Sequence, residues 1–434
     1  MKTSRQQLEE KIRSRSARAG IVGLGYVGLP LGVELAKAGF RVTGIDIGES
    51  KVERVNAGDS YVLDVPASTL GPLVSSGKLG ATTDFSVIRE LDTINICVPT
   101  PLRKTKDPDM SFIVSSCQEV ARHFHPGMLI ILESTTYPGT TDELVLPMLE
   151  KTGLRVGRDF FLCFSPERVD PGNPQYQTVN IPKVVGGCTA ACTDMGRLFY
   201  AQALERVVPV SSTQVAEMVK LLENTFRMIN IGLVNEMALM CDRMGIDVWE
   251  VIDAAATKPF GFMPFYPGPG LGGHCIPVDP FYLSWKTRQA GMEARFIELA
   301  GYINGYMPQF VADKVQQALN QAGKPVMGSR IHVMGVAYKR DIDDLRESPA
   351  LDVMLLLQRR GGVIVYTDPY VPVLRVEGLE LESQPEDSIS GADCVVIVTD
   401  HSAFDYRKMV ERAALIVDTR NALKGVDSPK IVRL

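Results

Sequence analysis

Short apolar runs alternate with amphipathic stretches over residues 18–210. The apolar runs are 19–25, 41–46, 93–99, 128–134 and 161–167, and stretches with helical spacing lie between them, as at 29–39 and 111–124. Strands that alternate with helices form βαβ units, and such units build a mostly parallel sheet. The pattern therefore predicts an α/β domain over 18–210, preceded by a polar leader helix over 1–17.

The pattern changes to long helical periodicity over residues 211–320. Apolar residues recur at helical spacing over 212–245, which is longer than an average globular helix, and a loop rich in Gly and Pro follows at 259–280. We predict a central helical domain here, with a long helix that connects two domains. Its apolar face needs cover, so we also expect a homodimer or a higher homo-oligomer.

Alternating strands and helices return after the helical region. Apolar runs at 330–338, 362–368, 393–400 and 415–420 predict a second α/β domain over 321–434. The predicted fold is thus two parallel-sheet domains joined by a long central helix with a helical middle domain. No sequence repeat joins the two halves beyond this shared pattern.

Composition and charge narrow the possible partners. The 434 residues are 45% hydrophobic and 22% charged, and the net charge is −5, so no basic footprint for nucleic acid is present. The charged N-terminus does not resemble a signal peptide and no segment suits a membrane span, so we expect a cytoplasmic protein without a membrane partner. The eight cysteines then favour free thiols, and we do not expect a metal site at Cys188 and Cys192.

A glycine motif follows the first predicted strand. GLGYVG places Gly23, Gly25 and Gly28 in the G-x-G-x-x-G spacing of a Rossmann dinucleotide site, between a strand and a helix. Asp46 ends the next strand, where a carboxylate accepts from ribose hydroxyls and repels a 2′-phosphate. We therefore predict NAD as the cofactor. The similar spacing in GPGLGG (268–273) follows no strand, so we interpret it as a rigid loop.

Two further loops end strands at the same sheet edge. CVPTP (97–101) and ESTTYPGTT (133–141) lie where parallel sheets bind ligands, although each could be a simple turn with Ser/Thr caps. The candidate cofactor contacts of this domain are Gly23, Gly25, Tyr26, Val27, Gly28, Asp46, Pro99, Thr100 and Thr135.

Candidate chemistry centres on Cys275. Glycines and prolines hold it on a loop, with His274 adjacent and Asp279 four residues on, whereas the other cysteines suit buried positions. Lys220 and Asn224 share one helix face and could donate to an oxyanion, although Lys220 could equally be a surface lysine. Glu167 of SPER could orient a water or accept a proton, or simply begin a helix.

These motifs together resemble the UDP-glucose/UDP-N-acetylhexosamine 6-dehydrogenase family over nearly the whole chain. The resemblance rests on GLGYVGLP, CVPTP, ESTTYPGT, SPER, KLLEN, GPGLGGHCIPVDP, GVAYKRDIDDLRESPA and VDTRN. The form GPGLGGHCIPVDPFYLSWK is similar to the bacterial UDP-N-acetylglucosamine 6-dehydrogenase branch, because the UDP-glucose enzymes typically have Ser where His274 stands and Lys where Val278 stands. The resemblance implies a role in making a cell-surface polysaccharide.

The resemblance also implies roles for individual residues. Cys275 matches the nucleophile, and Lys220 and Asn224 match the pair that stabilises the oxyanion. Asp279 matches an acid that supports the cysteine and a water, Thr135 matches the hydroxyl that holds this water, and Glu167 matches the acid of thioester hydrolysis. Arg346 matches a further cofactor contact. The implied substrate contacts are Glu167, Arg168, Lys220, Asn224, Phe265, Tyr266, Gly272, Tyr338, Lys339 and Arg420. SPERVDPG spaces its second acid, Asp170, differently from the family, so Asp170 receives no role.

The expected activity is a four-electron oxidation of the C6 alcohol of a UDP-sugar, with UDP-N-acetylglucosamine as the first choice. UDP-N-acetylmannosamine, UDP-N-acetylgalactosamine and UDP-glucose remain alternatives. A two-electron dehydrogenase of small hydroxy acids would need neither the cysteine nor a second α/β domain. A non-catalytic NAD-binding scaffold would have no reason to carry Lys220, Asn224 and Cys275 together.

Overall fold

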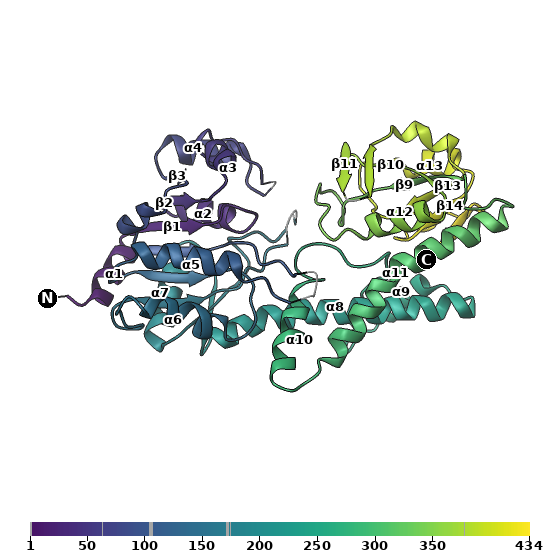
Figure 1. Ribbon diagram of the computed structural model, residues 1–434. Helices are drawn as coiled ribbons and strands as arrows, with labels where there is room; N and C mark the ends of the chain where they lie inside the picture. Colours follow the sequence, from purple (N-terminus) through teal and green to yellow (C-terminus); the bar gives the residue numbers. More distant parts are fainter. Residues whose placement is uncertain (1, 63, 104–106, 171–172, 174, 377) are drawn as a thin grey trace. The chain divides into compact units, whose positions relative to one another are not determined.

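A computed structural model describes residues 2–62, 64–103, 107–170, 173, 175–376 and 378–434 (Figure 1). The chain divides into two compact units. The first unit is Met1–Glu223 with Trp285–Gly291, and the second is Asn224–Ser284 with Met292–Leu434. The predicted fold class is confirmed, because each unit contains a parallel sheet and the long helix α8 (Thr213–Met244) runs from one unit into the other.

The first unit is built on an eight-stranded sheet in the order β3-β2-β1-β4-β5-β6-β7-β8. All neighbours pair in parallel except β6 and β7. The strands are β1 Arg18–Val22, β2 Arg41–Ile45, β3 Leu79–Thr82, β4 Thr93–Ile96, β5 Leu129–Leu132, β6 Phe161–Phe164, β7 Lys183–Gly187 and β8 Val207–Pro209. The helices are α1 Ser4–Arg13, α2 Gly28–Lys37, α3 Glu49–Asn56, α4 Ala67–Ser75, α5 Ser111–His123, α6 Leu146–Glu150 and α7 Ala190–Tyr200, with shorter helical turns at Phe85–Glu90 and Thr141–Val145.

The continuous apolar runs of the strands have a physical reason. In β5, Leu129 and Ile131 enter the core on one face of the sheet, whereas Ile130 and Leu132 enter the core on the other face. Sheets that are covered on both faces need apolar residues at every position, in contrast to the alternation of a half-exposed strand. The order β3-β2-β1-β4-β5-β6 is that of a Rossmann sheet, which binds its ligand where the strand order reverses, between β1 and β4.

The helix α1 differs from the polar leader that the sequence suggests. Thr3 and Gln6 form a capping box at its start. Leu8 and Ile12 are buried in the core of the first unit, and Arg5 pairs with Asp194 of α7. Two apolar residues one turn apart are therefore enough to dock this otherwise charged helix.

The second unit combines a helical part with a five-stranded parallel sheet in the order β10-β9-β13-β14-β15. Its strands are β9 Arg330–Met334, β10 Val363–Thr367, β13 Cys394–Ile397, β14 Ile416–Asp418 and β15 Ile431–Arg433, and β11 Val373–Val376 pairs with β12 Leu379–Glu382 in a separate hairpin. The helices are α9 Val248–Ala256, α10 Asp279–Gln289, α11 Arg295–Gln321, α12 Pro349–Arg359 and α13 Tyr406–Arg412, with a short helical turn at Glu386–Gly391. The start of α10, as far as Ser284, belongs to this unit, and its end, from Trp285 on, belongs to the first unit.

Close packing joins the two long helices of the second unit. A side chain at Gly232 of α8 would meet Ala300 of α11 at 3.1 Å, so the glycine permits this approach. Asn304 of α11 donates to the Met228 carbonyl at 3.1 Å and accepts from the Asn235 amide at 2.8 Å. Buried amides that satisfy one another fix the register of a helix pair.

Among the described residues, no helix combines the length and the apolar character that a membrane span requires.

Candidate active site

The glycine motif lies at the turn from β1 into α2. Gly23 has φ +93°, which favours glycine, and a side chain there would meet the Cys97 carbonyl oxygen at 2.6 Å. A side chain at Gly28 would lie 1.9 Å from the Gly23 carbonyl oxygen. At Gly25, by contrast, no atom of another described residue lies within 4 Å of the position that a Cβ would take. Two glycines thus allow tight packing, and the third leaves open the space into which a pyrophosphate fits.

Asp46 follows β2 and is 7% exposed. Its carboxylate accepts from the N–H of Leu24 at 2.8 Å and from the N–H of Gly48 at 2.9 Å, and Lys51 lies 3.3 Å away. The acid therefore stands directly beside the glycine turn, with its orientation fixed by two backbone donors. This arrangement fits the ribose of NAD.

The loops after β4 and β5 meet at the same edge of the sheet. The Ser134 hydroxyl donates to the Val98 carbonyl at 2.8 Å and so ties the two loops together. Thr100 is buried, Pro99 and Tyr26 are exposed, and Val27 and Thr135 are partly buried. Thr136 was not singled out from the sequence, yet its buried hydroxyl has no hydrogen-bond partner among the described residues. A hydroxyl in that state suits a bound water or ligand.

Glu217 of α8 fixes the loop that follows Thr136. Its carboxylate accepts from the N–H of Gly139 at 2.6 Å and from the N–H and hydroxyl of Thr141 at 2.9 and 2.7 Å. Burial raises the pKa of Glu217 to about 7, although these donors act to lower it. Further along the loop, the ring of Tyr137 packs against Trp285 with the ring centres 5.0 Å apart.

Glu167 belongs to a buried ionic network that the sequence did not reveal. Its carboxylate accepts from the N–H groups of Arg168 and Val169 at 2.7 and 2.8 Å, and Lys183 donates to it at 3.1 Å. Lys183 also donates to Glu133 at 2.5 Å. Burial acts to raise the pKa of Glu167, but the charge of Lys183 and the backbone donors outweigh it, so this pKa lies below its ordinary value.

Glu133 and Arg168 extend this network. Glu133 is fully buried and accepts from the Asn95 amide at 2.9 Å and from the Tyr200 hydroxyl. Nearer the surface, the guanidinium of Arg168 pairs with Glu223 at 2.6 Å and donates to the Pro182 carbonyl. On the same loop as Glu167, Asp170 accepts from the Asn173 amide at 3.2 Å.

Cys275 precedes α10 in the second unit and is partly buried. Its carbonyl accepts from the N–H of Val278 at 3.1 Å and from the N–H of Asp279 at 2.8 Å, in a turn that leads directly into α10. The buried carboxylate of Asp279 accepts from the Asn224 amide at 2.5 Å. One turn before Asn224 on α8, Lys220 is buried and is not the surface lysine of the alternative interpretation.

The glycines before Cys275 allow the loop to touch the C-terminal sheet domain. Side chains at Gly272 and Gly273 would meet Tyr338 at 2.5 and 2.8 Å, and the N–H of Gly273 donates to the Arg346 carbonyl at 3.0 Å. A side chain at Gly268 would meet Arg420 at 2.7 Å. The glycine loop therefore brings three predicted contact residues, Tyr338, Arg346 and Arg420, close to the segment that carries Cys275.

The remaining predicted contacts also lie in the second unit. The Arg346 guanidinium pairs with Asp344 at 2.7 Å. Burial and the nearby Arg340 lower the pKa of Arg420 to about 10. Phe265 packs edge-on against Phe226, with the ring centres 5.8 Å apart, and Tyr266 stacks on Trp249. Lys339 is partly buried.

Comparison with known proteins assigns the three parts of the chain. Residues 17–204 match the NAD binding domain of the UDP-glucose/GDP-mannose dehydrogenase family, residues 214–306 match its central domain, and residues 332–425 match its UDP binding domain. The predicted cofactor, NAD, is thereby confirmed.

Similar proteins span nearly the whole chain. The structure of UDP-D-ManNAc dehydrogenase from Pyrococcus horikoshii superimposes with a TM-score of 0.88 at 34% identity, covering 96% of this chain and 98% of that one. The NDP-N-acetyl-D-galactosaminuronic acid dehydrogenase of Ralstonia solanacearum is 34% identical over 92% of this chain and 95% of its own length. The UDP-N-acetyl-D-glucosamine 6-dehydrogenase of Pseudomonas aeruginosa is 34% identical over 90% of this chain and 92% of its own length. The chain therefore belongs to the UDP-glucose/GDP-mannose dehydrogenase family and is an NAD-dependent UDP-sugar dehydrogenase.

Proposed function

We propose that the chain oxidises the C6 alcohol of UDP-N-acetylglucosamine to the carboxylate, with Cys275 as the covalent nucleophile. The observation that carries this proposal is the hydrogen-bonded link from Cys275 through Asp279 to Asn224, because it joins three of the predicted catalytic residues from two distant segments. The overall reaction consumes one water and two NAD, and it yields the uronic acid, two NADH and three protons.

The residues of the chain divide the chemistry among them. The glycine turn and Asp46 would hold NAD, which would supply the hydride acceptor for each of the two oxidations. The Cys275 thiolate attacks the C6 aldehyde and forms a thiohemiacetal, which makes the aldehyde carbon a hydride donor and prevents its escape. Lys220 and Asn224 donate to the oxyanion that forms at this carbon. Loss of the second hydride leaves a thioester on Cys275.

Hydrolysis of the thioester releases the product. Glu167 and the hydroxyl of Thr135 orient the attacking water, and Asp279 supports the cysteine and this water. The Thr136 hydroxyl is a second candidate on the same loop, since it is buried and has no partner among the described residues. The carboxylate form of Glu167 suits this role, because the donors around it keep its pKa low.

Contacts to the substrate are proposed for residues of several segments. Lys339 and Arg420, together with Tyr338, hold the UDP end, since cationic side chains suit a pyrophosphate. Phe265 and Tyr266 pack on the sugar nucleotide, and Gly272 lets the loop approach it. Glu167, Arg168, Lys220 and Asn224 contact the sugar, and Arg346 contacts the cofactor.

The choice of sugar rests on the loop around Cys275. His274 and Val278 match the N-acetylglucosamine branch, but relatives that act on N-acetylmannosamine and N-acetylgalactosaminuronic acid nucleotides are equally similar. One methylene-sized change in a pocket shifts the preference between substrates by only about 1–3 kcal/mol. The decisive assay therefore offers UDP-N-acetylglucosamine, UDP-N-acetylmannosamine, UDP-N-acetylgalactosamine and UDP-glucose separately and compares kcat/KM from NADH formation. A higher value for any of the other three would overturn the assignment.

Stoichiometry tests the mechanism itself. The proposal requires two NADH for each sugar oxidised, whereas a two-electron dehydrogenase would form one and a scaffold none. Cys275→Ser should stop release of the acid, and Cys394→Ser, a buried thiol in the C-terminal sheet, serves as the matched control. Normal uronic acid production by Cys275→Ser would refute the covalent route.

We further propose a homodimer that covers the apolar face of the helical part. On α11 the side chains of Phe296 and Tyr302 are 75% and 74% exposed, and Leu233 and Met240 of α8 are also exposed. Exposed apolar side chains on these two helices suit an interface between copies of the chain. Light scattering after gel filtration should give a dimer for the native chain and a smaller species for Tyr302→Glu; a monomeric native chain would contradict the proposal.

A further inference from the structure

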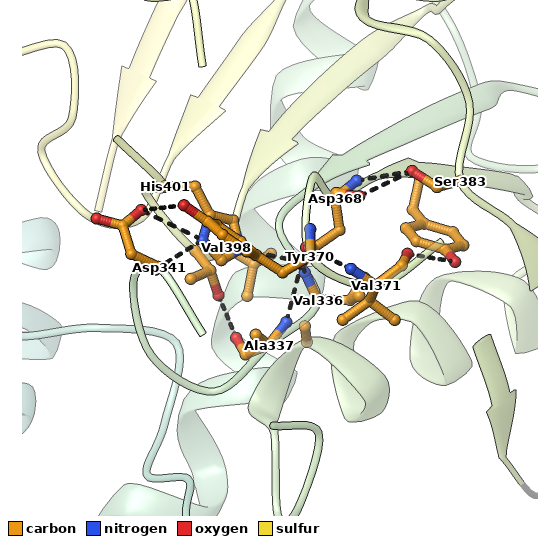
Figure 2. Close-up of polar contacts among 12 residues, drawn as sticks. Val336, Ala337, Asp341, Asp368, Tyr370, Val371, Ser383, Val398 and His401 are labelled. Carbon is orange, nitrogen blue, oxygen red and sulfur yellow. Dashed lines mark hydrogen bonds and ion pairs between the residues drawn. The ribbon is translucent and has the colours of Figure 1, made fainter. Parts of the chain in front are cut away.

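A buried polar cluster lies at the carboxyl ends of β9, β10 and β13 in the second unit (Figure 2). Asp368 follows β10 and is 3% exposed. One of its oxygens accepts from the N–H groups of Val336 and Ala337 at 2.7 and 3.2 Å, and the other accepts from the N–H groups of Tyr370 and Val371 at 2.8 and 3.1 Å. Burial acts to raise the pKa of Asp368, but His401 and these donors lower it below its ordinary value.

His401 is fully buried and links Asp368 to a more distant segment. Its Nε2 lies 3.0 Å from the Asp368 carboxylate, and its Nδ1 accepts from the backbone N–H of Asp341 at 2.9 Å. A carboxylate can only accept, so Nε2 carries the proton and Nδ1 does not. The ring is therefore neutral, and both nitrogens are used. The rings of Tyr370 and Phe404 pack around it.

Asp341 is the point at which His401 holds the chain. It has φ +61°, an uncommon conformation for a residue other than glycine, so the surrounding contacts must stabilise it. Its carboxylate accepts from the N–H and the hydroxyl of Ser402 at 2.8 and 2.6 Å. The backbone and the side chain of Asp341 are thus both bound to the segment that begins at His401.

This anchor lies within the loop that joins β9 to α12. Residues 335–348 form neither helix nor strand, and the structure describes all of them. Lys339 lies two residues before Asp341, and Arg346 lies five residues after it. Both are proposed contacts of the substrate or cofactor. A change in the backbone conformation of the loop would therefore displace both side chains.

We propose that His401 is a positioning residue for the nucleotide end of the substrate, because its neutral ring connects Asp368 to the Asp341 backbone and thereby sets the path of the Lys339 loop. The inference rests on the proposed function in one respect, namely that Lys339 contacts the UDP end. His401 itself touches neither ligand; it acts through the loop.

The experiment compares three substitutions of His401 by isothermal titration with UDP. His401→Gln retains a donor toward Asp368 and loses the acceptor for Asp341, whereas His401→Asn retains an acceptor near the position of Nδ1. His401→Phe fills the space but has neither the donor nor the acceptor. We expect UDP to bind about tenfold more weakly to the Gln and Phe variants and within about threefold of the native affinity to the Asn variant.

Kinetics separate positioning from a loss of folded protein. The Gln and Phe variants should raise KM for the UDP-sugar about tenfold, with KM for NAD unchanged and kcat within about twofold. His332→Phe is the matched control, because His332 is a second buried histidine of the same sheet, bonded to Thr367 and not to the loop. It should change the melting temperature and leave UDP affinity unchanged.

Two results would overturn the inference, and they differ from failure of the proposed function. If Lys339→Ala weakens UDP binding but His401→Gln and His401→Phe do not, His401 has no positioning role. If the His401 variants do not fold, Asp341→Asn replaces them: it keeps the backbone N–H that His401 accepts and weakens only the side-chain bonds to Ser402, so UDP affinity should stay within about threefold of the native value. A loss of about tenfold in this variant would show that the Asp341 side chain, and not His401, holds the loop, and would overturn the inference. If Lys339→Ala binds UDP as tightly as the native protein, the assignment of this loop to the UDP end is itself wrong.

Discussion

Replacement of Lys183 by Met tests the buried ionic network of the first unit. The Lys183 side chain is 5% exposed, and its ammonium lies 2.5 Å from Glu133 and 3.1 Å from Glu167. Met has a similar volume, so the substitution removes the charge and leaves little cavity. Two buried carboxylates would then face each other without a cation.

The expected loss of stability follows from that geometry. Removing one partner of a buried ion pair costs about 3–5 kcal/mol, because the remaining charge stays desolvated. In a domain of this size each kcal/mol moves the melting temperature by about 2–4 °C, so we expect a decrease of about 10 °C near neutral pH. An exposed pair gives the matched control: Lys37→Met, which removes the partner of Glu34, should change the melting temperature by no more than about 2 °C.

The pH dependence has a definite sign. In the native chain the pKa of Glu167 is lowered, so its contribution to stability is present above the unfolded pKa and is lost as the pH falls. Burial raises the pKa of Glu133, so the contribution of Glu133 has the opposite sign and is lost as the pH rises. In Lys183→Met the pKa of both carboxyls should lie above the unfolded value, because burial then acts without the lysine. Their contribution is then present below the unfolded pKa and lost as the pH rises. The variant should therefore be closest to the native stability near pH 5 and furthest from it near pH 8.

Thermal unfolding followed by circular dichroism at pH 5 and pH 8 measures both effects. The double substitution Lys183→Met with Glu133→Gln should recover part of the loss, since it removes one of the two uncompensated charges. The reasoning fails if Lys183→Met melts with the native chain at pH 8, or if its deficit is the same at both pH values.

Three further predictions address the cofactor edge of the same unit. Gly28→Ala should abolish NAD binding in a fluorescence titration, since its methyl group would lie 1.9 Å from the Gly23 carbonyl oxygen; native affinity would contradict this. Asp46→Ser should weaken NAD and reduce the preference over NADP about tenfold in kcat/KM, and an unchanged preference would show that Asp46 does not contact the ribose. The pKa of Glu217 is about 7, so its stabilising contribution is present below the unfolded pKa of about 4.5 and lost as the pH rises to about 7; Glu217→Gln should flatten the stability profile over that range, and an unaltered slope would refute the assignment.

The parts that the sequence predicted are those with a local physical signature. The strands of the first sheet are apolar at every position because both faces are covered, and the glycine turn is recognisable because Gly23 and Gly28 admit no side chain. Asp46 can be identified because it ends the strand next to that turn. Each signature lies within a few residues or in a fixed order of elements.

The ionic network and the histidine link had no such signature. Lys183 binds Glu133 and Glu167, which are 50 and 16 residues away along the sequence. His401 binds Asp341, which is 60 residues away. A charged residue in a strand is usually solvent-exposed, so Lys183 gave no sign that it is buried. The partners become visible only when the sheet brings the strand ends together.

The two sheet domains share the same packing arrangement at the turn after their first strand, although no sequence repeat relates them. Gly335 after β9 has φ +77°, and a side chain there would meet the Thr399 carbonyl oxygen at 2.3 Å, much as Gly23 packs on Cys97. The N–H of Val336, the residue after Gly335, donates to Asp368 at 2.7 Å, just as the N–H of Leu24, the residue after Gly23, donates to Asp46. A glycine turn and an acid on the neighbouring strand thus recur as a pair.

The domains differ in the segment that comes after this shared turn. In the first unit α2 begins at Gly28, five residues after the glycine, so the helix itself fixes the ligand-binding turn. In the second unit α12 begins only at Pro349, and the intervening loop has no helix or strand ladder but isolated backbone hydrogen bonds, such as that from the N–H of Tyr338 to the Asp344 carbonyl at 3.0 Å. Side chains supply further order, and His401 does so by extending the reach of Asp368 to Asp341. The longer loop gains room for cationic side chains, and it depends on a buried histidine where the first unit depends on a helix.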